Sequence, residues 1–479
     1  RMAWWNNEPW RLIQTNLREV DFATLNPNTY AQTLADLGAT VVLLNSAGIS
    51  ANYESKIEFQ QINPYVANPT ILHTLLEELH KRNIRVLART DFSKIPLSVG
   101  KTHPHWLYRT ATGKTMEYNG FVSVCINGEY QQTQALVILE ELFTEFPFDG
   151  LYCNMSGFQT RDYSHREYGF CHCQACVTAF YMYAQAPIPV AIDLQDPLYH
   201  AYLAFQEEVV DAWRKKINQF IKQIPNRELC FDGIDYDRRE SASETIHTPI
   251  DFIYHSSSNS RTAHPERIMS NSDVDFIGFT HRRISVPPAL HTLRLIQSLA
   301  HGGNLDYYLI GALESQVDRT GLKRVKKVFD LHKKNRPLFD GTVARPSVLL
   351  RRNDGWVISE EEKGWIILLT ELHITFTEAT KEKLLVLDLH SFDALILGDS
   401  VNLSLEEAKK IDAYANDGGK VVATGRSGFY DAAGPRTTPL LTSLNMNTIS
   451  SELNSANSAL FMLRSNDRLL FPSLQETDV

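Results

Sequence analysis

The chain has 479 residues, of which 43% are hydrophobic and 22% are charged. This composition is that of an average globular protein, and it excludes a disordered chain or a small disulfide-stabilised module. The net charge of −9 argues against a nucleic-acid-binding surface. The sequence contains neither an apolar run of about 18 residues nor a recognisable signal peptide, so we expect a soluble, cytoplasmic protein without membrane contact.

Short apolar runs alternate with segments of helical period along the first two thirds of the chain. This pattern predicts about eight β/α units and therefore an α/β fold, a (β/α)8 TIM barrel. A doubly wound open sheet is the alternative, but no glycine-rich phosphate turn follows the first strand. The predicted strands are Arg11–Leu17, Thr40–Asn45, Ile84–Thr90, Gly150–Asn154, Glu228–Ile234, Asp251–His255, Asp275–Thr280 and Asp306–Ile310. The predicted helices include Asn28–Leu37, Thr70–Arg82, Gln132–Phe143, Tyr199–Ile224 and Ala289–His301.

The pattern restarts after Pro337, which predicts a domain boundary near residue 340. We therefore expect a barrel domain over 1–339 and a smaller α/β domain over 340–479. The stretch from Phe392 to Gly425 is typical of a strand, helix and strand unit, because glycines follow the helix before the second strand begins.

Three of the six cysteines lie close together at Cys171, Cys173 and Cys176. This spacing suits thiolates that converge on one tetrahedral metal ion, and Zn²⁺ held by four thiolates is the best fit. The fourth ligand is predicted to be Cys125, with His172 as the runner-up. The alternative is a set of buried thiols without metal. Cys153 and Cys230 lie in apolar runs and are predicted to be core residues.

Several segments together resemble a known group of proteins. The barrel pattern, the cysteine cluster after the fourth strand and the C-terminal α/β domain resemble the family 42 β-galactosidases. The resemblance is nearer to a branch called hypothetical glycosyl hydrolase family 6, and its segments are Arg11–Arg18, Ala88–Ser93, Cys125–Gly128 and Gln159–Ser164. It implies a (β/α)8 glycosidase with a structural zinc, followed by a flavodoxin-like trimerisation domain, and hence a homotrimer.

The end of the fourth strand departs from the family 42 pattern. There the family has Asn-Glu, with the Glu as general acid/base, whereas this chain has Asn154 and Met155. A thioether cannot transfer a proton, and the amide of Asn154 is a poor nucleophile. The chain therefore either takes its carboxylates from elsewhere or has lost catalysis.

Glycoside hydrolysis ordinarily uses two carboxyl groups, which in a barrel lie at the C-terminal strand ends or in the loops beyond them. The favoured candidate is Glu240, because Arg239-Glu240-Ser241 resembles a loop of the family 6 branch. Asp232 is expected inside the fifth strand, facing the lumen. The other predicted catalytic acids are Asp162, Glu314 and Asp318.

Candidate substrate-binding residues surround these acids in the predicted loops. Hydroxyl-binding groups are predicted in Gln159–Tyr163, where the alternative is a loop that caps the cysteine module. His281 and Arg282 follow the predicted seventh strand and offer donors to an anionic group such as a uronate, or else pair with Asp275. The predicted substrate-binding residues are Asn154, Arg161, Tyr163, Asp91, Trp106, Asp235, His281 and Arg282.

Two functions remain open from the sequence. The first is a glycoside hydrolase that acts on a glycosidic bond of a small saccharide or glycoside with a carboxylate pair at the C-terminal face of the barrel. The alternative is a non-catalytic carbohydrate-binding protein on a degenerate glycosidase barrel. A metal-dependent hydrolase is a weaker third option, because the recognisable ligands form a closed set of thiolates.

Overall fold

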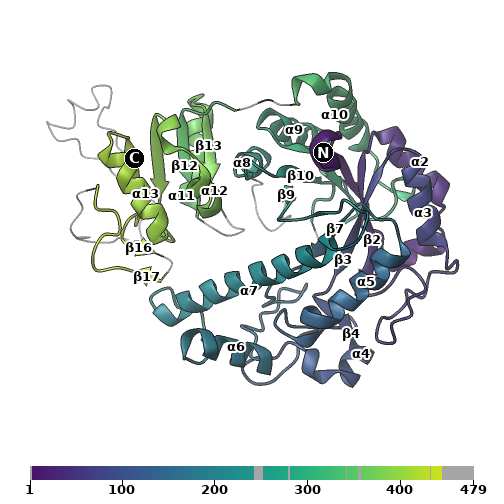
Figure 1. The fold of residues 1–479 in the computed structure, drawn as a ribbon. Coiled ribbons are helices and arrows are strands. Elements are labelled where there is room, and N and C mark those ends of the chain that lie inside the picture. The colour runs from purple at the N-terminus through teal and green to yellow at the C-terminus, as the bar shows by residue number, and fades with distance from the viewer. Residues whose placement is uncertain are drawn as a thin grey trace.

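The structure is a computed structural model that describes residues 3–241, 252–278, 281–340, 342, 344–353, 358–431 and 433–444. It has two parts, an eight-stranded sheet with helices around it and a smaller four-stranded sheet. Figure 1 shows the smaller sheet beside the barrel, with the long helix α7 (Pro197–Lys222) extending along the barrel toward it. None of the described helices has the length and apolar character required to span a bilayer.

The eight strands of the first part run parallel in the order β8-β7-β3-β2-β1-β11-β10-β9. The two end strands, β8 and β9, meet at an isolated bridge between Asp232 and Tyr236, so the sheet is a nearly closed barrel. This confirms the predicted (β/α)8 fold. The strands are β1 (Arg11–Gln14), β2 (Val41–Gly48), β3 (Arg85–Asp91), β7 (Gly150–Asn154), β8 (Cys230–Phe231), β9 (Tyr236–Ser241), β10 (Ile268–Val274) and β11 (Asn304–Tyr308).

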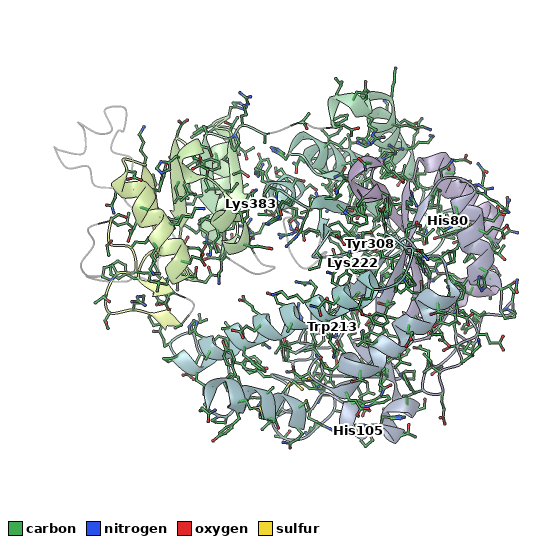
Figure 2. All side chains as sticks on the ribbon, viewed as in Figure 1. His80, His105, Trp213, Lys222, Tyr308 and Lys383 are labelled. Carbon is green, nitrogen blue, oxygen red and sulfur yellow. The ribbon has the colours of Figure 1, made fainter. Side chains whose placement is uncertain are left out.

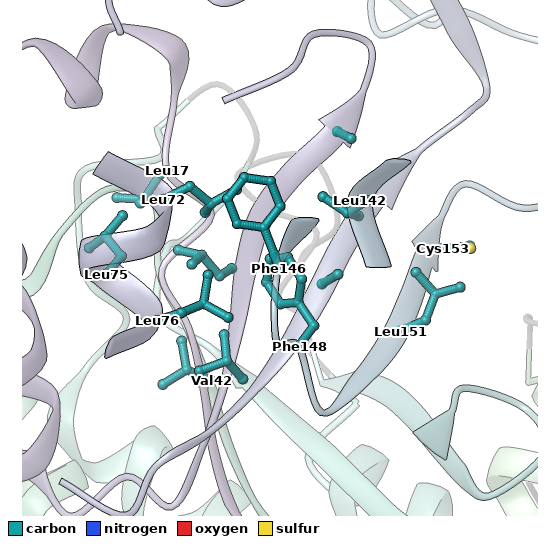
Figure 3. Packing of buried hydrophobic residues seen from close by; sticks show 14 of the residues in the cluster. Leu17, Val42, Leu72, Leu75, Leu76, Leu142, Phe146, Phe148, Leu151 and Cys153 are labelled. Atoms are coloured by element: carbon teal, nitrogen blue, oxygen red, sulfur yellow. The ribbon is translucent and has the colours of Figure 1, made fainter. Parts of the chain in front are cut away.

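Most of the helices around the barrel bury apolar faces against the outside of the sheet, whereas the short helix His255–Arg261 buries serines, an asparagine and an arginine. Figure 3 shows Phe146 and Phe148 between leucines of α3 and Leu142 of α5. Helix α2 shows how the sequence sets the ends, because the Asn26 side chain accepts the N–H of Thr29 and a left-handed Gly38 ends the helix. The helices are α1 (Trp4–Asn7), α2 (Pro27–Leu37), α3 (Ile71–His80), α5 (Ala135–Glu145), α7, α8 (His255–Arg261), α9 (Pro288–Ala300) and α10 (Leu322–Asn335).

Two of the barrel strands lie elsewhere than predicted. The sixth strand is β9 and not Asp251–His255, where Asp251 lies outside the described residues and His255 begins helix α8. The seventh strand is β10 and ends at Val274, before the predicted Asp275–Thr280. Both strands were missed because their lumen side chains are polar, which removes the apolar run that marks an ordinary barrel strand.

A smaller module projects from the barrel between β3 and α7. It consists of a three-stranded sheet and two helices, and it carries the four predicted metal-binding cysteines. Its elements are β4 (Lys94–Pro96), α4 (Leu97–Thr102), β5 (Glu117–Tyr118), β6 (Phe121–Ser123) and α6 (Gln174–Ala184).

The second part is a parallel sheet of order β13-β12-β14-β15, with a short hairpin, β16 and β17, after it. This order matches a doubly wound, flavodoxin-like domain, as predicted. Its sheet begins at Val348, ten residues after the 3-10 helix Arg336–Leu338 that follows α10. The elements are β12 (Val348–Arg351), α11 (Glu360–Glu371), β13 (Phe376–Ala379), α12 (Lys381–Val386), β14 (Ala394–Gly398), α13 (Leu405–Asn416), β15 (Val421–Thr424), β16 (Tyr430–Asp431) and β17 (Gly434–Pro435).

The two parts meet through a buried charge cluster. The Glu378 carboxylate on β13 accepts hydrogen bonds from Arg261 on α8 at 2.8 Å, Arg352 at 2.6 Å and Ser258 at 2.7 Å. Although burial alone would raise it, the pKa of Glu378 is lowered because the two guanidinium groups stabilise the carboxylate. The charge on Glu378 therefore links a barrel helix to the second sheet.

Candidate functional site

Two predicted site residues meet at the C-terminal ends of β3 and β7. The Asn154 amide donates to Asp91 Oδ2 at 2.8 Å, and the backbone and hydroxyl of Ser93 donate to Asp91 Oδ1 at 3.0 and 2.6 Å. Gly48 lets the end of β2 lie against the backbone of Asp91, because its φ is +113° and a Cβ there would lie 2.2 Å from the Asp91 carbonyl oxygen. Asp91 is thus buried, and its carboxylate already has three donors.

Glu240 lies near the C-terminal end of β9, and its side chain is 40% exposed. Its carboxylate accepts a hydrogen bond from Arg238 Nη1 at 3.2 Å. Arg238 and Glu240 are two residues apart on one strand, so both side chains point to the same face of the sheet. Glu240 is therefore an accessible carboxylate with a fixed cationic neighbour.

Arg238 is held by the layer of lumen side chains below Glu240. Its fully buried guanidinium donates to the Asp306 carboxylate at 2.8 and 3.1 Å and to the Ser272 hydroxyl at 2.9 Å. Asp306 also accepts from Ser270, which in turn accepts the indole N–H of Trp10. These contacts fix the position of the Arg238 guanidinium and therefore the direction from which it donates to Glu240.

Two tyrosines flank this pair in the barrel lumen. The guanidinium carbon of Arg238 lies 5.4 Å from the ring centroid of Tyr152 and 5.8 Å from that of Tyr308. The Tyr308 hydroxyl accepts a hydrogen bond from Asn16 at 3.0 Å, and Asn45 donates to Asn16. Figure 2 places Tyr308 at the centre of the barrel, where it ends β11 and pairs with Gln14 at the end of β1.

Asp232 supplies a second carboxyl group beside Arg238. It lies two residues after Cys230, which packs in the lumen cluster, so strand alternation directs Asp232 to the lumen. Its Oδ1 accepts the backbone N–H of Arg238 at 2.9 Å. Burial, followed by the nearby charge of Asp237, raises the pKa of Asp232 to about 7. Strand β8 ends at Phe231, so Asp232 follows the strand and does not lie inside it as predicted, and its raised pKa is visible only in the structure.

The other predicted catalytic acids have no hydrogen bond or ion pair with Glu240 in the described part of the chain. Asp162 accepts hydrogen bonds from Ser164, Arg166 and Tyr168 within its own loop, and these lower its pKa although desolvation opposes them. Glu314 accepts from Thr33 of α2, outside the lumen. Asp318 accepts hydrogen bonds from Thr320 and Ser285. The backbone N–H of Thr320 is the main cause of the lowered pKa of Asp318.

The remaining predicted binding residues are scattered. The prediction that Trp106 binds substrate is wrong. Its side chain is 2% exposed and stacks on His103 in the core, where no sugar can reach the face of the ring. Tyr163 is exposed, with the Lys94 ammonium 4.6 Å from its ring centroid, and exposed Arg161 lies in the same loop. Asp235 accepts from Lys222 at 2.7 Å.

His281 and Arg282 lie in the loop after β10, both partly buried, and the backbone N–H of His281 donates to Gly278. The same loop leads to a buried network that the sequence did not reveal. His291 Nδ1 lies 2.6 Å from Asp273 and its Nε2 lies 3.0 Å from the Ser285 hydroxyl. This order of groups is that of a Ser-His-Asp triad. However, Asp273 and Asp275 raise the pKa of His291 to about 9 against the effect of burial, and Ser285 donates to Asp275. A charged imidazole cannot accept the serine proton, so this network is structural.

The four predicted metal-binding cysteines converge in the projecting module. The sulfur atoms of Cys125, Cys171, Cys173 and Cys176 all lie within 4.8 Å of one another, and all four residues are buried. None of them forms a disulfide bond. His172 directs Nδ1 to the carbonyl of Phe170, so Cys125 completes the set. A compact set of four thiols suits a closed metal site.

A surface hollow of about 640 Å³ lies on the same module and is lined by residues 109–115, 117 and 166–168. None of the strand-end residues described above lines it, so it is separate from the barrel mouth.

Comparison with known proteins bears on this geometry. Residues 26–155 match the model of a family described as Hypothetical glycosyl hydrolase 6. The match covers 130 of the 479 residues, about a quarter of the chain. The matched stretch includes Asp91 and Asn154 and ends at Met155, so it stops before Glu240. No curated protein matches this chain in sequence.

Solved structures share the fold. The α-L-fucosidase isoenzyme 2 from Paenibacillus thiaminolyticus has a TM-score of 0.69 and 16% identity, over 91% of this chain and 66% of that chain. The β-galactosidase from Rahnella sp. R3 has a TM-score of 0.67 and 14% identity, over 89% and 72%. Gan42B, a GH42 β-galactosidase from G. stearothermophilus, has a TM-score of 0.65 and 13% identity, over 88% and 73%. These likenesses agree with the predicted (β/α)8 barrel fold.

Proposed function

We propose that this chain hydrolyses glycosidic bonds at the barrel mouth and that Glu240 is its reactive carboxylate. The observation that supports this most directly is the accessible Glu240 side chain, hydrogen-bonded to an Arg238 that Asp306 and Ser272 hold in place. The Arg238 guanidinium orients an accessible carboxylate, which is the kind of group that a nucleophile or general base requires.

Asp232 is the proposed partner acid. Glycosidases separate the roles of their two carboxyl groups by environment, so that one stays protonated near neutral pH and the other is ionised. Asp232, with its pKa near 7, fits the first role and donates a proton to the leaving oxygen. Glu240 attacks the anomeric carbon or activates water. Asp162, Glu314 and Asp318 are not assigned this role because their oxygens are engaged elsewhere.

The thiol cluster is proposed to hold one structural Zn²⁺. Four thiolates fill a tetrahedral shell, so the ion would stabilise the projecting module and leave no position for substrate. A carbohydrate substrate is proposed on the same grounds as the activity. A homotrimer stays a prediction of the resemblance, and a cytoplasmic location stays a prediction of the sequence.

A carbohydrate-binding protein without catalysis is the second candidate. The end of β7 favours it, because Asn154 donates to Asp91 and Met155 follows, so this strand provides no carboxyl group. Under this reading the mouth binds a sugar and Glu240 only accepts hydrogen bonds from it.

The test is a screen against aryl α- and β-glycosides of common neutral and acidic sugars. We expect turnover by the wild type, a loss of about 10²–10⁴-fold in kcat for Glu240→Gln, and unchanged kcat for the matched surface variant Glu266→Gln. Sugar binding without turnover, equal in wild type and Glu240→Gln, would instead establish the binding protein.

A further inference from the structure

Arg89 is a second cation at the barrel mouth, on the third strand. Leu87 packs in the lumen cluster with Leu12 and Val41, and Ala88 packs in the outer core. Strand alternation therefore directs Arg89 to the lumen, two residues nearer the mouth than Leu87. Asp91 follows it on the same face and ends the strand.

Within the described part of the chain, the side chain of Arg89 has no hydrogen bond and no ion pair, and its Nε is buried without an acceptor. Arg238, by contrast, has both Asp306 and Glu240 as partners. A partly desolvated guanidinium without a counter-charge is costly, and burying it further under a ligand costs more unless the ligand supplies the missing charge. The geometry around Arg89 therefore favours an anionic ligand.

The two lumen tyrosines locate Arg89 relative to Glu240. Burial is the main cause that raises the pKa of both Tyr152 and Tyr308, and Glu240 adds to the rise while Arg89 opposes it. Both charges thus act on the same pair of rings. Arg89 and Glu240 form no ion pair among the described residues, so the Glu240 carboxylate, which pairs with Arg238, does not supply the charge that Arg89 lacks.

We propose that Arg89 binds the carboxylate of a uronic acid and that this chain is specific for acidic sugars. The planar guanidinium matches a carboxylate with two parallel hydrogen bonds, a geometry that a neutral hydroxymethyl group cannot provide. Turnover of the uronide rests on the proposed function, whereas binding through Arg89 does not.

The experiment is calorimetric titration with the methyl α- and β-glycosides of glucuronic acid, galacturonic acid, glucose and galactose. Wild type and Glu240→Gln are expected to bind at least one uronide at least about 10-fold more tightly than its neutral counterpart. Arg89→Met removes that preference, Arg89→Lys retains part of it, and the exposed Arg324→Met on α10 leaves it unchanged. Thermal melting of each variant identifies any that do not fold.

The proposal is overturned if every uronide binds no more tightly than its neutral counterpart in the wild type, a comparison that needs no variant. It is also overturned if folded Arg89→Met keeps the preference, or if galactose 6-sulfate binds in an Arg89-dependent way while the uronides do not. Uronide binding that depends on Arg89, without turnover in the wild type, would support this inference and contradict only the proposed hydrolysis.

Discussion

At the scale of single residues, Arg238 determines the chemistry of the mouth. Its side chain donates to Glu240, and its backbone N–H donates to Asp232. The first contact orients a carboxylate that is open to solvent. The second contact is too weak to offset the burial of Asp232, whose pKa stays near 7. One arginine thus has two carboxyl groups as neighbours in different environments, one exposed and one desolvated.

The raised pKa of Asp232 predicts a pH-dependent stability. The folded state holds a proton near pH 7 that the unfolded chain releases near pH 4, so wild-type stability falls as pH rises from about 4 to about 7. Asp232→Asn is neutral throughout and keeps the acceptor for Arg238. We expect its free energy of unfolding, relative to wild type, to increase over this range by up to about 4 kcal/mol.

Urea unfolding at pH 5 and pH 8 measures this difference, with the exposed Asp330→Asn on α10 as control. A difference between Asp232→Asn and wild type that does not change with pH would show that Asp232 is ionised in the folded state. The proposed general acid would then have to be another group.

Sequence reasoning located part of the site. The cysteine spacing identified the thiol cluster, and the strand-end rule brought out Asp91 and Asn154, which the structure joins by a hydrogen bond. Loop acids such as Asp162 were misleading because a carboxylate in a loop often binds its own backbone, and spacing alone does not distinguish this use. The role of Arg89 depends on a missing partner, which only three-dimensional structure reveals.

At the scale of elements, the apolar runs predicted six barrel strands near their observed positions. Strands β9 and β10 were missed because their lumen positions hold polar residues, Arg238, Ser270 and Ser272. Arg238 and Ser270 donate to Asp306, and Ser272 accepts a hydrogen bond from Arg238. A strand whose inner face is a hydrogen-bonded network has no hydrophobic period to detect. The strands that periodicity failed to identify are therefore those that carry the candidate carboxylate and its support.

The projecting module depends on its thiol cluster. Loss of one ligand should release zinc and weaken the packing of α6, because metal binding and local folding are coupled. We expect about one zinc per chain in the wild type, and for Cys125→Ser a loss of that zinc together with a Tm lower by roughly 5 °C or more. Elemental analysis and thermal melting measure both.

Cys153→Ser is the matched control, because Cys153 is also buried but accepts from Thr90 and lies outside the cluster. A wild-type protein that folds without metal and melts at the same temperature after chelation would contradict the zinc assignment and favour four buried thiols.

At the scale of the molecule, Glu378 is the charge on which the contact between the two sheets depends. Glu378→Gln would leave Arg261 and Arg352 buried opposite a neutral amide, which typically costs about 3–5 kcal/mol. We expect this variant to melt at a lower temperature, with the second domain more accessible to limited proteolysis.

Glu382→Gln provides the comparison, because Glu382 pairs with Arg267 between the same parts while its own side chain is 59% exposed. An exposed pair is worth at most about 1 kcal/mol. Equal melting temperatures for the two variants would mean that the buried cluster contributes no more than a surface pair.

Helix α7 connects the two ends of the molecule. Its last residue, Lys222, contacts Asp235 and the Trp5 ring, and near its start the His200 ring lies so close to Gly434 that a Cβ there would come within 2.9 Å. The second domain is therefore held at two separate places, by α8 at its sheet and by α7 at its hairpin (Figure 1). A domain held by two separate contacts cannot rotate freely relative to the barrel, as it could if a single linker joined them. The distance from Asp235 in the barrel to the hairpin is thus set by the length of α7, so a longer or shorter helix would shift the second domain relative to the barrel without altering any residue of the candidate site.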